Sequence, residues 1–286
     1  RSSTELEPSM ELFSNGSTSA PVVPAGETET RVDIQTIELE GMTLRIVSPL
    51  NAPTLLPTII YYYGGCFVSG GFATHDNQLR QLAYYGQCRI IAVQYRLAPE
   101  HTFPAAHDDA QRGAELVRQH AERLGVDKQR ITLAGDSAGG HLALVTALRL
   151  KRAGEWQPAQ LILIYPMLDA TAHFESYIRN GHDYIITRDT LLSGVEMYLP
   201  GIERRHPEAS PIWRNDFNGL PPVHIITAEY DPLCDEGEAL YHRMTGQGVQ
   251  CTCQRYLGVI HGFFQLGGIS EAARSALRDV AWRAGR

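Results

Sequence analysis

The stretch Leu133-Ala-Gly-Asp-Ser-Ala-Gly-Gly-His141 decides how the rest of this sequence is interpreted. A β-prone run, 130–134, leads into Gly135-x-Ser137-x-Gly139, and a long helical pattern, 142–152, follows at once. A serine on a tight strand-to-helix turn, with glycines two residues before and after it, is typical of a nucleophile elbow. The helix N-terminus beside the serine favours an oxyanion there. Glycine-rich turns also occur for structural reasons alone, so the pattern needs support from elsewhere in the chain.

Length and composition indicate one globular α/β domain over residues 1–286. The chain is 43% hydrophobic and 20% charged, which is ordinary for a globular protein large enough to bury a substantial core. Its formal charge of −7 and the lack of a basic block argue against a nucleic-acid partner. The longest apolar runs, such as 161–165, are too short to span a bilayer. Five scattered cysteines indicate reduced thiols in a cytoplasmic protein.

Strands and helices alternate from residue 57 onward. Strands are predicted at 32–39, 42–47, 57–63, 89–95, 131–134, 161–165, 223–228 and 250–256, and helices at 76–85, within 103–124, and at 142–152, 188–199, 236–245 and 270–283. Right-handed crossovers then give a doubly wound, mostly parallel sheet with helices on both faces, led by an antiparallel hairpin. Residues 168–211 break the alternation and are expected to lie over the sheet as an insertion.

Side chains that follow strands are expected to gather at the carboxyl edge of such a sheet. A serine hydroxyl needs a base within reach and an acid that orients the base. After an elbow of this type the expected chain order is serine, acid, histidine. Asp231 and His261 each follow a predicted strand, in Glu229-Tyr-Asp-Pro-Leu233 and Val259-Ile-His-Gly-Phe263. The sequence therefore predicts Ser137, Asp231 and His261 as the catalytic residues.

Other assignments remain open at these positions. Asp-Pro is a common turn opener, so Asp231 has a purely structural interpretation, and Glu229 is then the alternative acid. His261 is one of 11 histidines, most of which must be surface or core residues without a catalytic role. His141 is nearer to the serine in sequence, but it lies on the helix after the elbow and is expected to face away. Asp136 is expected to brace the turn.

A glycine-rich loop, Tyr63-Gly-Gly-Cys66, follows the predicted strand 57–63. Backbone N–H groups must converge on a developing oxyanion, and glycine lets the backbone approach closely. We predict an oxyanion hole formed by the N–H groups of Gly64, Gly65 and Ala138. Loss of one such donor typically costs about 2.7–4 kcal/mol of transition-state stabilisation. A plain glycine turn is the alternative interpretation.

Together these motifs resemble the hormone-sensitive-lipase-like (family IV) bacterial carboxylesterases of the α/β-hydrolase superfamily. The resemblance runs from Pro57 to the C-terminus. It is carried by Gly135-Asp-Ser-Ala-Gly-Gly140, by Tyr95-Arg-Leu-Ala-Pro-Glu100 with Phe103-Pro-Ala-Ala106, by Asp231-Pro-Leu233 with Asp235-Glu-Gly237, and by His261-Gly-Phe263. It implies the α/β-hydrolase fold, catalysis without cofactor or metal, and a cap formed by residues 1–30 and 168–211. It also implies a possible homodimer through the last strand, 250–256.

The chain departs from this family's pattern in the oxyanion loop. The usual motif is His-Gly-Gly-Gly, and Tyr63 lacks the imidazole that normally props the loop. Cys66 adds a side chain near the acyl or alcohol pocket. The resemblance further implies a structural turn at Arg96 and Glu100, held by a buried ion pair. Four aromatic residues are expected either to line the pocket or to fill the cap core: Tyr177, Tyr184, Tyr198 and Trp213.

We predict a serine carboxylesterase that hydrolyses small-molecule, short-chain acyl esters through an acyl-enzyme intermediate. The small cap and the bulk of Cys66 favour short chains. Two alternatives stay open: an amidase or sugar deacetylase on the same triad, and a non-catalytic ligand receptor of the same fold. The plant gibberellin receptor resembles this fold but lacks the triad histidine, so the presence of His261 favours chemistry.

Overall fold

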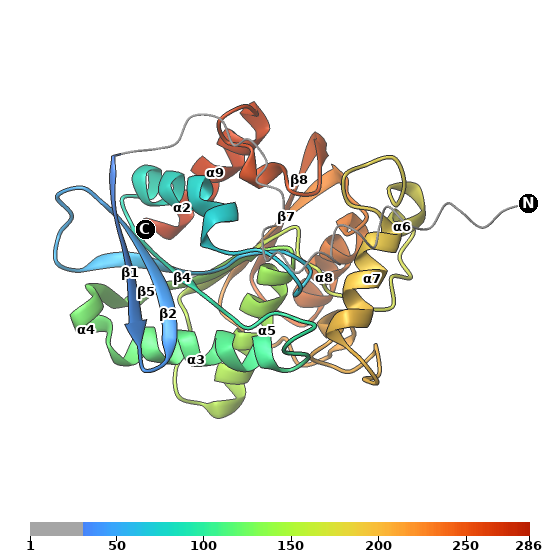
Figure 1. Ribbon diagram of the computed structural model, residues 1–286, viewed down its shortest axis with the longest axis horizontal. Helices are drawn as coiled ribbons and strands as arrows, with labels where there is room; N and C mark the ends of the chain where they lie inside the picture. Colours follow the sequence, from blue (N-terminus) through green and yellow to red (C-terminus); the bar gives the residue numbers. More distant parts are fainter. Residues whose placement is uncertain (1–30) are drawn as a thin grey trace, which may run out of the picture.

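One eight-stranded sheet forms the centre of the computed structural model, which describes residues 31–286 (Figure 1). Its strands are β1 Val32–Leu39, β2 Met42–Pro49, β3 Leu56–Tyr62, β4 Arg89–Val93, β5 Val126–Asp136, β6 Gln160–Ile164, β7 Val223–Tyr230 and β8 Cys251–Ile260. They lie in the order β1-β2-β4-β3-β5-β6-β7-β8. The β1–β2 and β2–β4 pairs are antiparallel and the others are parallel. The predicted doubly wound sheet with its antiparallel hairpin is confirmed.

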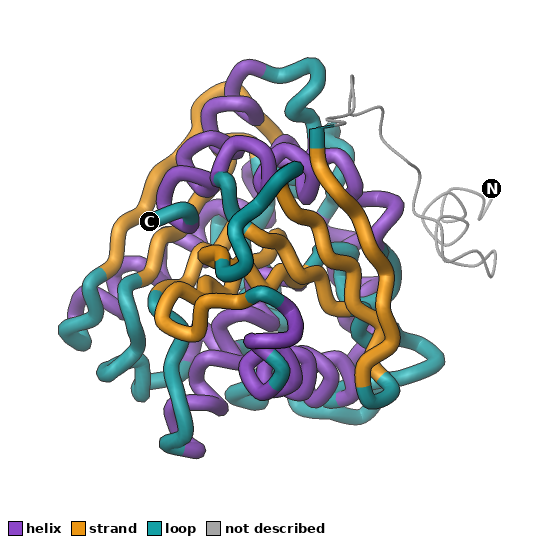
Figure 2. Tube along the Cα trace, turned by 90° about the vertical axis from the view of Figure 1, so that its left-hand side faces the viewer, coloured by secondary structure: helices purple, strands orange, loops and turns teal. Residues whose placement is uncertain are grey.

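Helices cover both faces of this sheet, above and below the strands in Figure 2. They are α2 Phe72–Gly86, α3 Ala105–Gln119, α4 Ala121–Leu124, α5 Ala138–Ala153, α6 Ser176–Arg179, α7 Arg188–Tyr198, α8 Cys234–Gly246 and α9 Glu271–Ala284, with 3₁₀ turns η1 Pro211–Trp213 and η2 Phe263–Gln265. α2 packs against α9 on one face, and α3 packs against α5 on the other (Figure 1). Covering both faces requires apolar central strands, and every residue of β3 is buried.

The helix α5 is buried on nearly all sides, as its apolar sequence predicts. It runs beneath the sheet from the end of β5 and contacts β3, β5 and β6. Fully burying one leucine of such a helix contributes about 1.5–3 kcal/mol of hydrophobic free energy. This packing fixes the point at which α5 begins, directly after Ser137.

Several elements begin or end at different residues from those predicted. α2 begins at Phe72 instead of residue 76, because the Thr74 hydroxyl bonds both the N–H and the carbonyl of Gly71 at 3.0 Å. α5 begins at Ala138 instead of residue 142. β8 continues to Ile260 instead of residue 256, since it keeps its pairing with β7 beyond an irregularity. The last extension places His261 at the very end of a strand.

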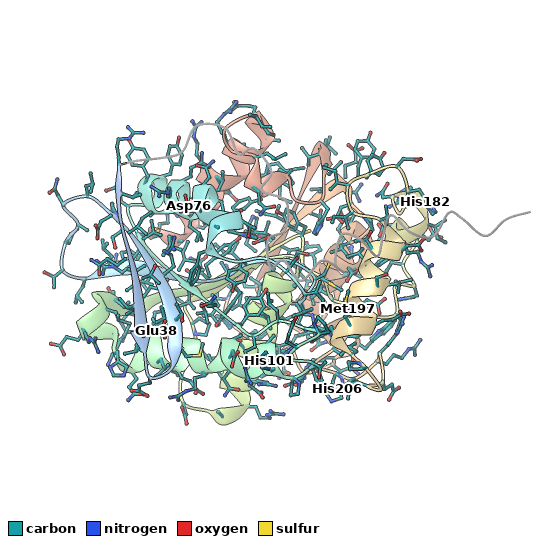
Figure 3. All side chains as sticks on the ribbon, viewed as in Figure 1. Glu38, Asp76, His101, His182, Met197 and His206 are labelled. Carbon is teal, nitrogen blue, oxygen red and sulfur yellow. The ribbon has the colours of Figure 1, made fainter. Side chains whose placement is uncertain are left out.

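The connection between β6 and β7 holds α6, α7 and η1 and lies at one end of the sheet, where Figure 3 labels His182, Met197 and His206. α7 begins as predicted after Thr187, whose hydroxyl accepts the N–H of Thr190 at 3.2 Å. Arg149 of α5 holds this connection through two hydrogen bonds to the Glu208 carboxylate, at 2.8 and 2.5 Å. The predictions for residues 1–30 lie outside the described residues.

The expected ion pair between Arg96 and Glu100 is wrong. Arg96 bonds the carboxylate of Asp109 through Nε and Nη2, at 2.9 and 3.0 Å, and its backbone N–H bonds the same carboxylate at 2.8 Å. Asp109 lies in the first turns of α3, directly across the loop, and it therefore reaches Arg96 while Glu100 points to solvent. The loop is held by a half-exposed ion pair to a helix, not by a buried one within itself.

All five cysteines are free thiols. Cys251 and Cys253 lie on β8, and Cys66, Cys88 and Cys234 are buried. Among residues 31–286, no helix combines the length and the apolar character needed to cross a membrane.

Candidate active site

Ser137 occupies the turn between β5 and α5 with φ 58° and ψ −118°, a conformation that side chains rarely adopt. The turn closes because two flanking glycines let the backbones touch. A Cβ on Gly135 or Gly139 would lie 2.5 or 1.8 Å from the carbonyl oxygen of Tyr62 in β3. The Ser137 N–H donates to the Ile164 carbonyl of β6 at 2.8 Å. The elbow is therefore fixed between two neighbouring strands.

The structure brings the three residues predicted to act together into one hydrogen-bonded row. Asp231 directly follows β7, and His261 directly follows β8. His261 Nδ1 lies 2.7 Å from Asp231 Oδ2, and His261 Nε2 lies 3.0 Å from the Ser137 hydroxyl. Asp231 is fully buried, and its other oxygen accepts the N–H of Leu233 at 2.8 Å. One imidazole thus bridges a buried carboxylate and a serine hydroxyl.

Tyr165, which the sequence analysis did not single out, packs against this imidazole. Its ring centre is 4.5 Å from that of His261 and 5.8 Å from that of Phe263. Tyr165 directly follows β6, is buried, and has a φ of 32°. Its N–H is held by the Ile226 carbonyl at 2.7 Å. The position after a strand was the one available signal, but an aromatic residue there carries no chemical signature.

The alternative acid and base lie away from the serine hydroxyl. Glu229 is within β7, and its carboxylate accepts the N–H of Gly258 at 2.7 Å. His141 is buried against α3 and the β6–β7 connection, with Nδ1 2.8 Å from the Met167 carbonyl and Nε2 2.7 Å from the Glu208 carbonyl. Neither side chain takes the place of Asp231 or His261 in the row.

The oxyanion loop differs from the prediction in one donor. The N–H of Gly64 points to His75 Nε2, 3.3 Å away, so it is directed into the protein and not toward the serine. Within residues 31–286, the N–H groups of Gly65, Cys66 and Ala138 have no acceptor. A Cβ on Gly64 would lie 3.0 Å from the Cβ of Ser137, which places this loop directly against the elbow. The geometry favours Cys66 over Gly64 as a donor.

Tyr63 stands where the family usually has a histidine, and other contacts hold it in place. Its ring stacks on that of Tyr95 at 4.8 Å between centres and meets Phe72 edge-on at 6.0 Å. The Tyr95 hydroxyl donates to the Tyr63 carbonyl at 2.5 Å. Aromatic packing and this hydrogen bond hold the start of the loop.

The Cys66 side chain faces α7. A Cβ on Gly194 would lie 3.1 Å from that of Cys66, so the absence of a side chain at Gly194 lets α7 approach Cys66 closely. Burial, with a smaller contribution from the Asp231 carboxylate, raises the pKa of Cys66 to about 12. Cys66 is therefore an uncharged thiol between the loop and the β6–β7 connection.

Asp136 braces the elbow from within, as expected. Its carboxylate accepts the Tyr61 hydroxyl at 2.6 Å and lies 3.0 Å from His75 Nε2. Burial opposes ionisation of Asp136, but the charge and hydrogen bond of His75 and the hydrogen bond of Tyr61 outweigh it and lower its pKa. A second buried Asp–His pair thus lies beside Ser137. In the described part of the chain, no group of three or more His, Cys, Asp or Glu side chains is arranged to hold a metal ion.

Comparison with known proteins places this arrangement in a family. Residues 59–265 match the model of a family described as an alpha/beta hydrolase fold. The carboxylesterase NlhH of Mycobacterium tuberculosis is 33% identical over 255 residues, which cover 87% of this chain and 80% of that protein. The ethyl acetate hydrolase of Pseudomonas putida is 34% identical over 260 residues, covering 88% and 81%.

Solved structures give the same result. The hyperthermophilic esterase of the archaeon Pyrobaculum calidifontis superposes with a TM-score of 0.85 at 38% identity, covering 97% of this chain and 89% of that one. A thermostable esterase from Pseudomonas putida superposes with a TM-score of 0.86 at 30% identity, covering 91% and 84%. With its elbow, its sheet order and these relatives, the chain belongs to the hormone-sensitive-lipase-like (family IV) branch of the α/β-hydrolase fold.

Proposed function

We propose that this protein is a serine carboxylesterase that uses Ser137, His261 and Asp231 as its catalytic triad. The observation that carries the proposal is the position of His261, 2.7 Å from the Asp231 carboxylate and 3.0 Å from the Ser137 hydroxyl. A base within hydrogen-bond reach of a serine, oriented by a buried acid, is what an inert hydroxyl needs to become a nucleophile. The named activities of its relatives, carboxylesterase and ethyl acetate hydrolase, support an ester as substrate.

In the proposed mechanism, Ser137 Oγ attacks the ester carbonyl while His261 Nε2 takes its proton. The imidazolium then donates that proton to the leaving alkoxide as the tetrahedral intermediate collapses to an acyl-enzyme and an alcohol. Water, deprotonated by the same histidine, attacks the acyl carbon, and the proton returns to Ser137 as the acid leaves. Asp231 keeps the Nδ1 proton of His261 facing itself, so that Nε2 faces the serine.

The N–H groups of Gly65, Cys66 and Ala138 are proposed to receive the oxyanion. All three lack an acceptor within residues 31–286. Ala138 is the first residue of α5, so its N–H points away from the helix and carries the positive end of the helix dipole. Preorganised donors of this kind cost no reorganisation when charge develops on the oxygen.

We propose short-chain acyl esters as the substrate class. Ser137 is only 4% exposed, and the contact between Cys66 and Gly194 brings α7 against the oxyanion loop. We propose that residues 1–30 and 168–211 form a cap over this site. Comparing p-nitrophenyl butyrate with the decanoate tests the chain length; faster turnover of the decanoate contradicts it.

A homodimer through β8 and a cytoplasmic location complete the proposal. Among residues 31–286, β8 is the edge strand of the sheet, and no other strand of this part of the chain pairs with its outer side, which can pair with a second copy. The five free thiols fit a reducing compartment. Sedimentation of the purified protein tests the dimer, and monomers at micromolar concentration contradict it.

The function is tested by hydrolysis of p-nitrophenyl butyrate with Ser137→Ala and Ser275→Ala. Ser275 is exposed on α9, remote from the triad, and serves as the matched control. We expect the first variant to lose activity by about 10⁴-fold or more while remaining folded, and the control to match the wild type. Retained turnover in Ser137→Ala removes Ser137 from the mechanism. A panel with amides and acetylated sugars in the same assay separates an esterase from an amidase or deacetylase.

A further inference from the structure

His75 of α2 contacts three segments that surround Ser137. Its Nε2 atom lies 3.0 Å from Asp136 of the elbow, 3.3 Å from the Gly64 N–H of the oxyanion loop, and 3.2 Å from the Gln265 side-chain amide of η2. The ring is only 4% exposed. A second residue of α2, Gln78, lies on the other side of the same carboxylate, with its amide nitrogen 2.5 Å from the Tyr61 hydroxyl and 3.4 Å from Asp136 Oδ1. Asp76, labelled in Figure 3, instead accepts a hydrogen bond from Arg80 at 2.8 Å. His75 therefore joins the elbow, the oxyanion loop and the turn after His261.

The partners of the ring determine where its protons lie. Asp136 is ionised, and a carboxylate only accepts hydrogen bonds, so the 3.0 Å contact requires a proton on His75 Nε2. A protonated Nε2 does not accept the N–H of Gly64, which therefore only lies beside it at 3.3 Å. The other nitrogen, Nδ1, lies 2.8 Å from the Thr74 hydroxyl, which itself bonds Gly71. His75 is thus a fixed donor to Asp136, with both ring nitrogens occupied within the protein.

This donor matters because of the charge that it faces. The Asp136 carboxylate is adjacent to the nucleophile, and its Oδ2 lies 2.7 Å from where a Cβ on Gly64 would be. A buried negative charge beside the oxyanion hole opposes a second negative charge there. Hydrogen bonds from His75 to Oδ2 and from Tyr61 and Gln78 to Oδ1 offset this charge and fix the carboxylate in one orientation.

We propose that His75 is a positioning residue for ester hydrolysis: it holds the elbow through its hydrogen bond to Asp136, whose carboxylate packs against Gly64, so that the N–H groups of Gly65, Cys66 and Ala138 converge on the oxyanion. The inference rests on the proposed function. Among the hydrogen bonds of the described residues, His75 has none to the Ser137 hydroxyl or to His261, so it acts through Asp136. Its loss misplaces the donors and lowers the rate of the chemical step more than it weakens substrate binding.

The chain provides a matched control for this residue. His224 of β7 is also 4% exposed, with Nδ1 2.7 Å from the Thr252 hydroxyl and Nε2 3.1 Å from Asp279 Oδ2. It therefore lies, like His75, between a threonine hydroxyl and an aspartate carboxylate, although its approach to Asp279 is a charge contact without hydrogen-bond geometry. Its partners lie in β8 and α9, and none belongs to the elbow or to the oxyanion loop. A loss of stability is expected from both histidines, but a loss of chemistry only from His75.

The test compares His75→Ala, His75→Gln, His75→Asn and His224→Ala with the wild type in hydrolysis of p-nitrophenyl butyrate. Because small misplacements of catalytic groups cost up to about 10²-fold, we expect kcat of His75→Ala to fall about 10- to 100-fold with KM changed less than about threefold. His75→Gln, whose amide reaches Asp136, regains part of kcat, whereas the shorter His75→Asn does not. His224→Ala lowers the melting temperature but keeps kcat within about twofold of the wild type.

Several results of the same assay would contradict the role proposed for His75. A folded His75→Ala with wild-type kcat overturns the inference, as does an equal loss of kcat in His224→Ala. If His75→Ala does not fold, the Gln and Asn variants decide, and equal kcat values in the two contradict a role for the donor to Asp136. A wild type no more active than Ser137→Ala refutes the proposed function itself, so the two failures are distinguishable.

Discussion

Two Asp–His pairs flank Ser137, and they use their rings in opposite ways. The Asp231–His261 pair joins through Nδ1 and leaves Nε2 3.0 Å from the Ser137 hydroxyl. The Asp136–His75 pair joins through Nε2 and leaves Nδ1 2.8 Å from the Thr74 hydroxyl, which is bonded to Gly71 at the start of α2. The far nitrogen of His261 thus contacts the Ser137 hydroxyl, which has no other hydrogen bond among the described residues. The far nitrogen of His75 contacts the Thr74 hydroxyl, which is already bonded to the backbone at the start of α2.

The two sites differ in the hydroxyl that the far ring nitrogen contacts, and not in the Asp–His pair itself. Both carboxylates are buried, and both imidazoles are held firmly. Ser137 lies on a strained turn that exposes its hydroxyl to His261, whereas Thr74 lies within a regular helix. An Asp–His pair in a structure therefore becomes a candidate for base catalysis only when the far nitrogen meets a group with no other hydrogen bond to make. The following changes test this contrast.

The largest effect is expected at His261. Replacing His261 with alanine removes the proposed base, and we expect kcat for p-nitrophenyl butyrate to fall by about 10⁴- to 10⁶-fold. His224→Ala in the same assay controls for the loss of a buried histidine. An activity of His261→Ala within tenfold of the wild type contradicts its role as the base.

The two acids are expected to differ by about two orders of magnitude. Asp231→Asn permits the wrong tautomer of His261, and the expected loss in kcat is about 10⁴-fold. Asp136→Asn leaves the triad intact and weakens only the brace, so we expect a loss of about 10- to 100-fold. Measuring kcat for both variants in one assay checks that the loss is larger for Asp231→Asn. Equal losses would contradict the proposal that the two pairs have different roles.

Acid stability is expected to report the Asp136 brace. Its folded-state pKa is lowered, so the unfolded chain binds this proton at a higher pH than the folded chain does. The stabilisation from Asp136 is then present above about pH 4 and is lost as the pH falls through its lower, folded-state pKa. We expect the free energy of unfolding of Asp136→Asn to fall less steeply below pH 4 than that of the wild type. Urea titrations from pH 5 to pH 3 measure this, and parallel slopes contradict the prediction.

The smallest effect is expected where the oxyanion loop meets α7. A methyl group on Gly194 would crowd Cys66 at 3.1 Å, so Gly194→Ala should destabilise the protein and Cys66→Gly should relieve the crowding. The double variant is then more stable than the sum of the single changes by about 0.5–1 kcal/mol. Urea unfolding of all four proteins measures this coupling. If the changes in unfolding free energy of the two single variants add up to that of the double variant, steric contact between the two residues is contradicted.

The site was predictable where its signals are local. Glycines around Ser137 mark the turn, and Asp231 and His261 each follow an apolar run that predicts a strand. Parallel strands bring such ends to one edge of a sheet, so order and spacing were enough to bring three distant residues together. The sheet itself followed from the same alternation of strands and helices.

The remaining features depend on packing that the sequence pattern does not encode. His75 lies in a helix, 61 residues before Asp136 in the sequence. The two residues meet only because α2 packs near the carboxyl edge of the sheet, where Asp136 ends β5. Gly64 is predicted as a donor because glycine lets the backbone approach closely, but the sequence does not show that its N–H turns toward His75 in the folded loop. The family resemblance implies a pair of Arg96 with Glu100, whereas the carboxylate within hydrogen-bond reach of Arg96 is that of Asp109.

The most direct test of the account is reaction of the protein with a fluorophosphonate ester, followed by peptide mass spectrometry. Such a probe bonds covalently only to a serine that a neighbouring base has activated. We expect one phosphonyl group per chain, on the peptide that contains Ser137, and no labelling of His261→Ala on the same timescale. Labelling of another serine, or equal labelling of both proteins, contradicts the claim that His261 activates Ser137.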